Sequence, residues 1–176
     1  MLSVFLLILF VSFSVVIFFG APYLPTLKKE KIEAIALLDL RKGELFLELG
    51  SGDGRMLKAM AKNQVFCIGY ELNPLLVLIS KVICWRQREY ITIKWANFWN
   101  EKLPNADGIY VFLLDKYMEK LNSKIFKQKN SHPIKLVSYA FEIPKKKYEK
   151  KKRSSLSVQV LILKIILKKL CQIMVA

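Results

Sequence analysis

The sequence has few of the residues that bind metals or form disulfides. His132 is the only histidine, and the three cysteines, Cys67, Cys84 and Cys171, are far apart and include no C-x-x-C pair. Structural zinc sites need closely spaced cysteines or histidines, and disulfide-stabilised domains use paired cysteines. We therefore expect no metal site, free cysteines in a reducing compartment, and no role for His132, which lies in a polar stretch before a proline.

The first twenty residues lack charge altogether. Residues 1–20 contain three serines as their only polar side chains, and a helix of that length spans about 30 Å, the thickness of the hydrocarbon core of a bilayer. A cleaved signal peptide is less favoured, because no basic residue precedes the apolar run and Pro22 follows Gly20-Ala21. We predict a transmembrane anchor over 1–20, with a cleaved signal or a buried or interfacial helix as alternatives.

The basic residues are unevenly distributed along the chain. The first of them follow the apolar run, and by the positive-inside rule this predicts a single-pass protein with its globular part in the cytoplasm. Residues 1–144 hold 19 basic and 13 acidic side chains, a difference of +6, while residues 145–176 supply the remaining +9 of the net charge of +15. Because the excess is concentrated in the tail, it favours an anionic lipid bilayer surface over a nucleic acid as partner.

Apolar segments and turn-forming residues alternate between residues 21 and 144, which we predict to be one domain. The pattern indicates short buried strands at 44–49, 65–70, 90–95, 108–114 and 135–141, and helices at 27–40, 55–62, 73–88 and 116–127. Strands that alternate with helices at this spacing predict an α/β fold, a doubly wound parallel sheet with helices on both faces. In the first helix the predicted buried stripe consists of Ile32, Ile35, Ala36 and Leu38.

The first predicted strand ends in a glycine-rich turn, Glu48-Leu-Gly50-Ser-Gly52-Asp-Gly54. Glycines at alternating positions let the backbone approach a ligand that a Cβ atom would exclude, and the helix after the turn points its N–H groups at the same place. The second strand ends in Glu71, where a Rossmann-like unit has an acid that accepts hydrogen bonds from ribose hydroxyls. The two features together predict a site for a nucleoside-containing cofactor.

The spacing of the glycines distinguishes between two such cofactors. Dinucleotide binding requires G-x-G-x-x-G, whereas this turn is G-x-G-x-G with Glu48 two positions before the first glycine. A carboxylate at that position suits a ligand with an ammonium group and would repel a pyrophosphate. The sequence therefore favours S-adenosylmethionine over NAD.

At these residues the chain resembles the class I S-adenosylmethionine-dependent methyltransferases. It is most similar to a small membrane-anchored family that includes the mitochondrial lysine methyltransferases of ATP synthase and of the adenine nucleotide translocase. The resemblance implies a Rossmann-like sheet with strand order 3-2-1-4-5, S-adenosylmethionine as cofactor and a protein lysine, in a membrane protein for example, as acceptor. It is carried by residues 20–26, 48–55, 69–74, 97–99 and 137–144.

The resemblance also implies which residues bind the cofactor. In that family the acids and glycines hold the methionine and ribose, the residues after the third strand adjoin the adenine, and the loop after the anchor closes over the cofactor. The matching residues here are Pro25, Thr26, Glu48, Gly50, Gly52, Glu71, Asn97 and Phe98. Each has a structural alternative, such as a salt bridge for Glu48, a turn for Asn97 and a helix N-cap for Thr26.

The acceptor side is less well defined by the sequence. Asp115 and Tyr117 follow the fourth strand, where the superfamily binds its substrates, but no residue stands out as a catalytic base. The Asn/Asp-Pro-Pro-Tyr motif of enzymes that methylate DNA bases is absent. Besides a protein lysine, the alternatives are a lipid-soluble small molecule as acceptor, which an anchor would also serve, and a non-catalytic membrane-bound interaction module.

The link between the third and fourth strands and the last segment of the chain both test the expected topology. Residues 98–105 must reach from the third strand to the fourth across the middle of the sheet, and eight residues leave no room for a crossover helix. We therefore predict an extended link that leaves one face of the sheet less covered. The family normally ends with a hairpin of two further strands, whereas here residues 157–165 suit a final strand, an interfacial helix, or a truncated or frame-shifted end.

Overall fold

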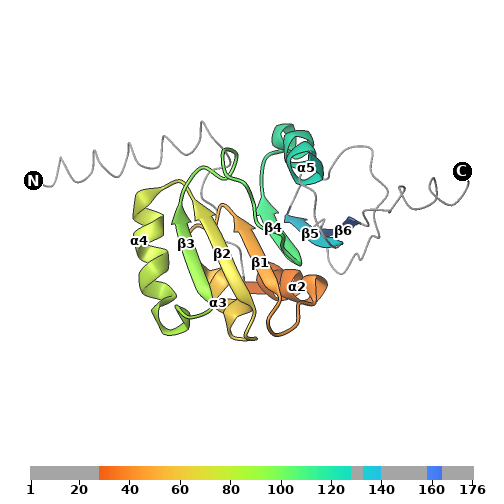
Figure 1. Cartoon of the computed structure of the whole chain (residues 1–176). Coiled ribbons are helices and arrows are strands. Elements are labelled where there is room, and N and C mark those ends of the chain that lie inside the picture. Colours follow the sequence, from red (N-terminus) through yellow and green to blue (C-terminus); the bar gives the residue numbers. More distant parts are fainter. Residues whose placement is uncertain (1–27, 128–132, 140–157, 164–176) are drawn as a thin grey trace, which may run out of the picture.

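A computed structural model describes residues 28–127, 133–139 and 158–163 of the chain (Figure 1). The predicted anchor at 1–20, Pro25 and Thr26, and most of the tail lie outside these residues. No helix within the described ranges is long and apolar enough to cross a membrane. The strands are β1 Leu45–Leu49, β2 Phe66–Glu71, β3 Ile91–Trp95, β4 Gly108–Phe112, β5 Ile134–Tyr139 and β6 Val158–Leu163. The helices are α2 Lys28–Leu38, α3 Arg55–Ala61, α4 Pro74–Ile83 and α5 Met118–Lys127, with short 3-10 turns η1 Trp85–Gln87 and η2 Asp115–Tyr117.

The strands form a single sheet in the order β3-β2-β1-β4-β5-β6. The first five pair in parallel, with β1 in the centre between β2 and β4. This confirms the predicted order 3-2-1-4-5. Because all five parallel strands point the same way, the carboxyl ends of β1 and β2 lie at one edge of the sheet, where ligands of open α/β sheets bind.

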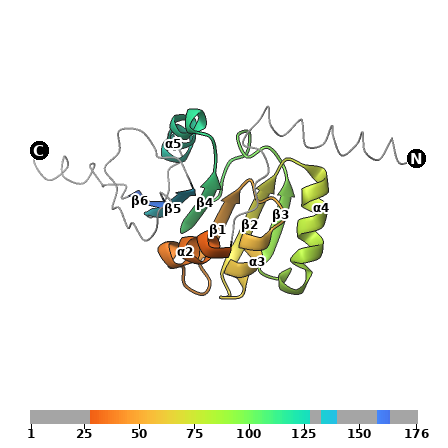
Figure 2. The ribbon, with the colours of Figure 1, turned by 180° about the vertical axis from the view of Figure 1, so that it is seen from behind.

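The sheet separates two hydrophobic layers. On one face α2 and α3 pack against the central strands through Ala34, Leu38, Met56 and Leu57, and α4 borders α3 (Figures 1 and 2). On the other face α5 is the one helix of the described ranges, and it packs through Met118, Leu121 and Ile125. The predicted doubly wound arrangement, with helices on both faces, is thus confirmed within the described residues.

The buried stripe predicted for α2 is wrong in part. The buried positions of this helix are Glu30, Ala34 and Leu38, whereas Ile32 is 56% exposed. The cause lies at Gly108, where a Cβ atom would come within 3.1 Å of Leu38 Cδ2. The end of α2 approaches β4 so closely that Leu38 must face the sheet, and a helical turn of about 100° per residue then directs Ile32 outward.

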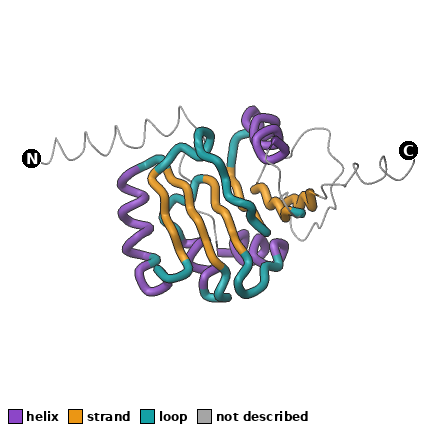
Figure 3. The backbone as a smooth tube through the Cα atoms, in the orientation of Figure 1, coloured by secondary structure: helices purple, strands orange, loops and turns teal. Residues whose placement is uncertain are grey.

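The link between β3 and β4 is extended, as predicted. Residues 98–100 form a turn and 102–106 have no regular structure, and Figure 3 shows this connection as loop throughout. Phe98, Leu103 and Ala106 fill the space beside α5 where a crossover helix would otherwise lie. Phe66 lies at the start of β2 on the same face as Ile68 and Tyr70 and is 47% exposed. That face of the sheet is therefore less covered there, as predicted.

The last described strand, β6, runs antiparallel to β5, with Ile134 opposite Leu163 and Tyr139 opposite Val158. Of the three alternatives for residues 157–165, the structure therefore has the strand. It covers the β5 edge, which would otherwise present unpaired backbone groups. Residues 140–157 and 164–176, which include the rest of the expected hairpin region, lie outside the described residues.

Candidate active site

The glycine-rich turn after β1 is held against the end of β2. The backbone N–H groups of Gly50 and Ser51 both donate hydrogen bonds of 2.9 Å to the carbonyl oxygen of Tyr70. Gly50, Gly52 and Gly54 all have positive φ angles, of 90°, 53° and 77°, a conformation that costs other residues about 1–2 kcal/mol. The turn thus reverses the chain tightly enough for α3 to begin at Arg55.

The two ends of the turn differ in the space around them. A Cβ atom at Gly54 would lie 2.9 Å from Ser80 Cβ and 3.0 Å from Cys84 Sγ, so this glycine is needed for α3 to pack on α4. A Cβ atom at Gly50 would meet nothing within 4 Å. The open space at Gly50 is where a ligand can contact the backbone.

Glu71 closes the turn from the neighbouring strand. Its carboxylate is 5% exposed, and Oε2 accepts a 2.8 Å hydrogen bond from the N–H of Gly52. Oε1 accepts hydrogen bonds from the N–H groups of Leu72, at 2.9 Å, and Asn73, at 2.8 Å. Each carboxylate oxygen has two lone-pair directions, so the two bonds to Oε1 occupy that oxygen, and Oε2 can accept one further hydrogen bond from a ligand. Burial raises its pKa, and the three backbone N–H groups counteract that rise.

Glu48 lies at the end of β1, one strand away from Glu71. It is 5% exposed, and its Oε2 has no hydrogen-bond partner among the described residues. Burial raises the pKa of Glu48 well above its usual value, the nearby carboxylates Asp53 and Glu71 raise it further, and a hydrogen bond from the backbone of Leu57 lowers it. A buried carboxylate oxygen without a hydrogen-bond partner destabilises the protein. A bound cation would offset the desolvation of ionised Glu48 and its repulsion by Asp53 and Glu71.

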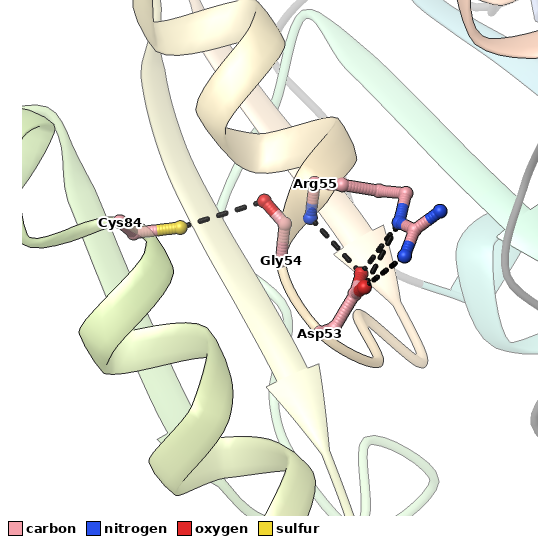
Figure 4. Close-up of polar contacts among 4 residues, drawn as sticks. All are labelled: Asp53, Gly54, Arg55 and Cys84. Carbon is pink, nitrogen blue, oxygen red and sulfur yellow. Dashed lines mark hydrogen bonds and ion pairs between the residues drawn. The ribbon is translucent and has the colours of Figure 1, made fainter. Parts of the chain in front are cut away.

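Asp53 and Arg55, to which the sequence pattern gave no role, form a pair in the structure. The Arg55 Nε donates to Asp53 Oδ1 at 3.0 Å and to Oδ2 at 2.9 Å, and Nη2 also bonds Oδ2 (Figure 4). Figure 4 also shows the Cys84 Sγ approaching the carbonyl oxygen of Gly54, at 3.4 Å. Burial raises the pKa of Cys84 to about 11, so this thiol stays protonated and helps to hold the end of the turn.

Asn97 and Phe98 follow β3 at the same edge of the sheet. The Asn97 Oδ1 accepts a 3.1 Å hydrogen bond from the N–H of Trp99, so this side chain forms the turn that was its alternative role. Phe98 is 9% exposed and packs on Trp99 with ring centroids 4.6 Å apart. Both residues follow the third strand, as the sequence indicated, and their described contacts are structural. Their place beside an adenine stays a prediction.

The link and α5 are joined by a residue that sequence reasoning missed. Lys124 Nζ donates hydrogen bonds to the carbonyl oxygens of Trp99, at 3.0 Å, and Glu101, at 2.7 Å. Burial lowers the pKa of Lys124, and the nearby Glu101 counteracts that effect. Nothing in the spacing of Lys124 along the chain indicates its role. Trp99 also contacts Tyr117, after β4, with ring centroids 6.1 Å apart.

The described part of the site fits a cationic nucleoside ligand. Glu48 and Glu71 are buried carboxylates at the ends of neighbouring strands, and Asp53 is a buried carboxylate in the turn between β1 and α3. The Arg55 side chain pairs with Asp53. The unpartnered Glu48 oxygen suits an ammonium or sulfonium group, the open space at Gly50 admits a ligand, and Glu71 Oε2 can accept a hydrogen bond from a ribose hydroxyl. S-adenosylmethionine has all three features, whereas the pyrophosphate of a dinucleotide would add negative charge to an already acidic site.

Solved structures support the fold. The chain superposes with a TM-score of 0.73 on an RNA methyltransferase from Salinibacter ruber in complex with S-adenosyl-L-homocysteine, at 21% identity, covering 81% of this chain and 96% of that one. At this level of identity the similarity establishes the architecture and leaves the substrate open.

Curated proteins with similar sequences are lysine methyltransferases. The human lysine N-methyltransferase named for the C subunit of ATP synthase is 31% identical over 106 residues, which are 59% of this chain and 45% of that protein. A protein-lysine N-methyltransferase from Saccharolobus islandicus (strain REY15A) is 27% identical over 128 residues, 69% of this chain and 78% of that protein. The chain thus spans about half the length of the human relative.

The family itself is identified by a match over most of the described domain. The model of the ANTKMT methyltransferase domain matches residues 48–150, which begin at Glu48 and include the glycine-rich turn, Glu71 and the β3–β4 link. The match confirms the predicted class I S-adenosylmethionine-dependent methyltransferase. Because it covers more than half of the sequence, the chain belongs to the ANTKMT methyltransferase domain family.

Proposed function

We propose that this protein transfers the methyl group of S-adenosylmethionine to the amine of a lysine side chain in a membrane-associated protein. The observation that carries the proposal is the pair of buried acids, Glu48 and Glu71, at the ends of β1 and β2 on either side of the glycine-rich turn. The lysine acceptor is supported by the curated relatives, which include the adenine nucleotide translocase lysine N-methyltransferase of the mouse, 29% identical over 107 residues.

Each residue of the site has a part in this proposal. Glu71 Oε2 accepts a hydrogen bond from a ribose hydroxyl and Glu48 faces the positive charge of the cofactor. Gly50 and Gly52 let the backbone approach the methionine moiety. Asn97 and Phe98 border the adenine, while Pro25 and Thr26, outside the described residues, close over the cofactor.

The chemistry requires mainly that the acceptor be positioned. S-adenosylmethionine supplies an electrophilic methyl group when bound, and in-line displacement from sulfur gains most of its acceleration from orientation of the nucleophile. The lysine amine must reach this site in its neutral form. Tyr117 and Trp99, beyond the carboxyl ends of β4 and β3, are available to line the path of its side chain.

The membrane tether is part of the same proposal. The uncharged residues 1–20, followed by a basic flank, support a single-pass helix that leaves the methyltransferase domain in the cytoplasm. A tether would hold the enzyme near acceptors in membrane proteins. It would equally serve a lipid-soluble small molecule, which is the second candidate acceptor.

The test follows the methyl group. The full-length protein is incubated with isolated membranes and S-adenosylmethionine labelled in the methyl group, and the membranes are then separated into protein and lipid fractions. We expect label in protein, its loss in Glu71→Ala, and its retention in Glu89→Ala, which changes an exposed acid on the loop before β3. Label in the lipid fraction would favour the small-molecule acceptor. Absence of S-adenosylmethionine binding altogether would favour a non-catalytic interaction module.

A further inference from the structure

Helix α4 presents large apolar side chains to the outside of the molecule. Leu78 is 61% exposed, Ile79 37%, Val82 71%, and Trp85, in the η1 turn that follows, 63%. We call these four residues the α4 patch. Helical spacing places them on one side of α4, opposite the buried Leu76, Val77 and Ser80. Apart from the patch, the exposed large hydrophobics among the described residues are Ile32, Phe66 and Trp95.

A helix that is apolar on all sides normally lies inside a protein or in lipid. The inner side of α4, with Leu76 and Val77, is buried and contacts β2, β3 and α3. The outer side lies at the margin of the molecule, beside the edge strand β3, in both views of the ribbon (Figures 1 and 2). The patch therefore needs a partner outside the described part of the chain.

The charges around the patch indicate which partner. Between Leu72 and Arg88 the sequence has three basic residues, Lys81, Arg86 and Arg88, and no acidic one. Lys81 and Arg86 are exposed, and the Arg88 guanidinium lies 4.5 Å from the centre of the Trp85 ring. A second copy of the chain packing through the same patch would bring these cations against one another, because symmetric contacts pair a surface with itself. An anionic surface would attract them.

Two tryptophans complete the pattern. Trp85 follows α4, and Trp95, 67% exposed, donates its indole N–H to the carbonyl oxygen of Leu72 at 3.0 Å, just before α4 begins. Tryptophan is enriched at the boundary between lipid headgroups and acyl chains, and helices that present an apolar face bordered by basic residues lie flat in that boundary. We infer that the α4 patch rests in the headgroup region of an anionic bilayer, as a membrane contact separate from residues 1–20.

This contact would orient the domain. Asn73 caps the start of α4, with its Oδ1 accepting the N–H of Leu75 at 2.9 Å, and also donates its backbone N–H to Glu71. The helix therefore begins at the cofactor edge of the sheet. With α4 flat on the bilayer, that edge stands beside the membrane surface, within reach of a lysine close to the headgroups. The orientation matters for catalysis only if the proposed acceptor is correct, whereas the contact itself does not depend on it.

The contact can be measured without any methyl transfer. The full-length protein is reconstituted into vesicles of mixed phosphatidylcholine and phosphatidylglycerol whose acyl chains carry bromine near the headgroup, and quenching of tryptophan emission is recorded. We expect strong quenching that falls markedly in Trp85→Tyr and is largely kept in Trp99→Phe. It should also fall in Val82→Glu but not in Ile32→Glu, a matched change of an exposed apolar residue on α2.

The remaining outcomes are equally informative. Circular dichroism melting checks that Val82→Glu is folded. If Val82→Glu does not fold, Arg86→Glu takes its place, because it changes only the charge beside the patch and should also reduce quenching. Unchanged quenching in Trp85→Tyr and in Arg86→Glu would overturn the inference. So would efficient disulfide formation between two copies of Leu78→Cys in the vesicles, which would show that a second chain covers the patch. Because the readout is fluorescence, failure here leaves the methyltransferase proposal standing, and the reverse is also true.

Discussion

The N–H of Gly52 donates a 2.8 Å hydrogen bond to the Glu71 carboxylate, across 19 residues of sequence. This bond ties the glycine-rich turn after β1 to the end of β2. Glu71 thereby has a structural role in the protein itself, in addition to the proposed contact with the ribose. A variant at this position therefore has to be analysed for stability and for cofactor binding separately.

Replacing Glu71 by alanine should affect both properties. The change leaves the N–H groups of Gly52, Leu72 and Asn73 without their acceptor, and unsatisfied buried donors cost about 1–3 kcal/mol each. We expect a lower melting temperature and at least a roughly tenfold weaker affinity for S-adenosylmethionine by calorimetry. Glu71→Gln, which keeps one acceptor oxygen, should be intermediate in both. Unchanged affinity in Glu71→Ala would remove the ribose contact from the account.

Glu48 should make both stability and cofactor binding depend on pH. Its pKa is raised in the folded protein, mainly by burial, so the folded state holds a proton that the unfolded state releases between its ordinary pKa and the raised one. By linkage, the free energy of unfolding falls as pH rises through that window. Above this pH range Glu48→Gln should therefore have a higher free energy of unfolding than the wild type. Below it, where Glu48 is protonated in both states, the variant should have no advantage in stability.

The same substitution has the opposite effect on the cofactor. A positively charged ligand favours ionised Glu48, so the wild-type affinity for S-adenosylmethionine should rise with pH through the window, while Glu48→Gln should bind more weakly with a flatter profile. Glu71 also has a raised pKa, and its titration contributes to the affinity profile of both proteins. The affinity is therefore measured by calorimetry at a series of pH values, and the wild type is compared with Glu48→Gln at each pH. Parallel profiles for the two proteins would contradict the assigned role of Glu48.

The glycine-rich turn offers a matched pair of substitutions. Gly50→Ala and Gly54→Ala both place alanine at a positive φ, at a cost of about 1–2 kcal/mol each. Gly54→Ala also overpacks against Ser80 and Cys84, which adds about 1–3 kcal/mol. Thermal unfolding should show Gly54→Ala as clearly the less stable, whereas Gly50→Ala should lose cofactor affinity while remaining folded. Normal cofactor binding by Gly50→Ala would mean that the ligand does not approach the turn there.

Lys124 should stabilise the link between β3 and β4. Lys124→Met removes two hydrogen bonds, to Trp99 and Glu101, each worth about 1 kcal/mol. We expect a lower free energy of unfolding and faster hydrogen exchange in residues 98–106. The control is Lys120→Met, whose exposed ammonium lies 4.6 Å from the Trp99 ring centre and contributes about 0.5–1 kcal/mol. Equal effects of the two variants would show that the hydrogen bonds of Lys124 are not what holds the link.

The sequence predicted the parts of this fold that depend on local pattern and chain length. The alternation of strands and helices and the parallel sheet follow from hydrophobic spacing, and the extended link follows from the eight residues available from Phe98 to Asn105. The strand order came from the family resemblance and agrees with that short link. The predicted helix at 73–88 is divided, because α4 ends at Ile83 and continues as the η1 turn.

What depends on tertiary contacts was not predictable in the same way. The buried stripe of α2 was misplaced, because the approach of Leu38 to Gly108 fixes the rotation of the helix. The outer face of α4 was missed, because its exposed residues Leu78, Ile79 and Val82 are as apolar as the buried Leu76 and Val77. In the site, Glu48, Gly50, Gly52 and Glu71 lie where they were expected, whereas the Asp53–Arg55 pair and Lys124 became visible only in the structure.

The proposed activity of this protein is the transfer of a methyl group to a protein lysine. Its most direct test is hydrolysis of the protein fraction labelled from methyl-labelled S-adenosylmethionine, followed by chromatography of the labelled amino acids. We predict that the label elutes as N-methylated lysine, and that it is absent when the full-length protein carries Glu71→Ala but present with Glu89→Ala. Label recovered as a methyl ester, as methylated arginine or histidine, or in lipid would contradict this claim.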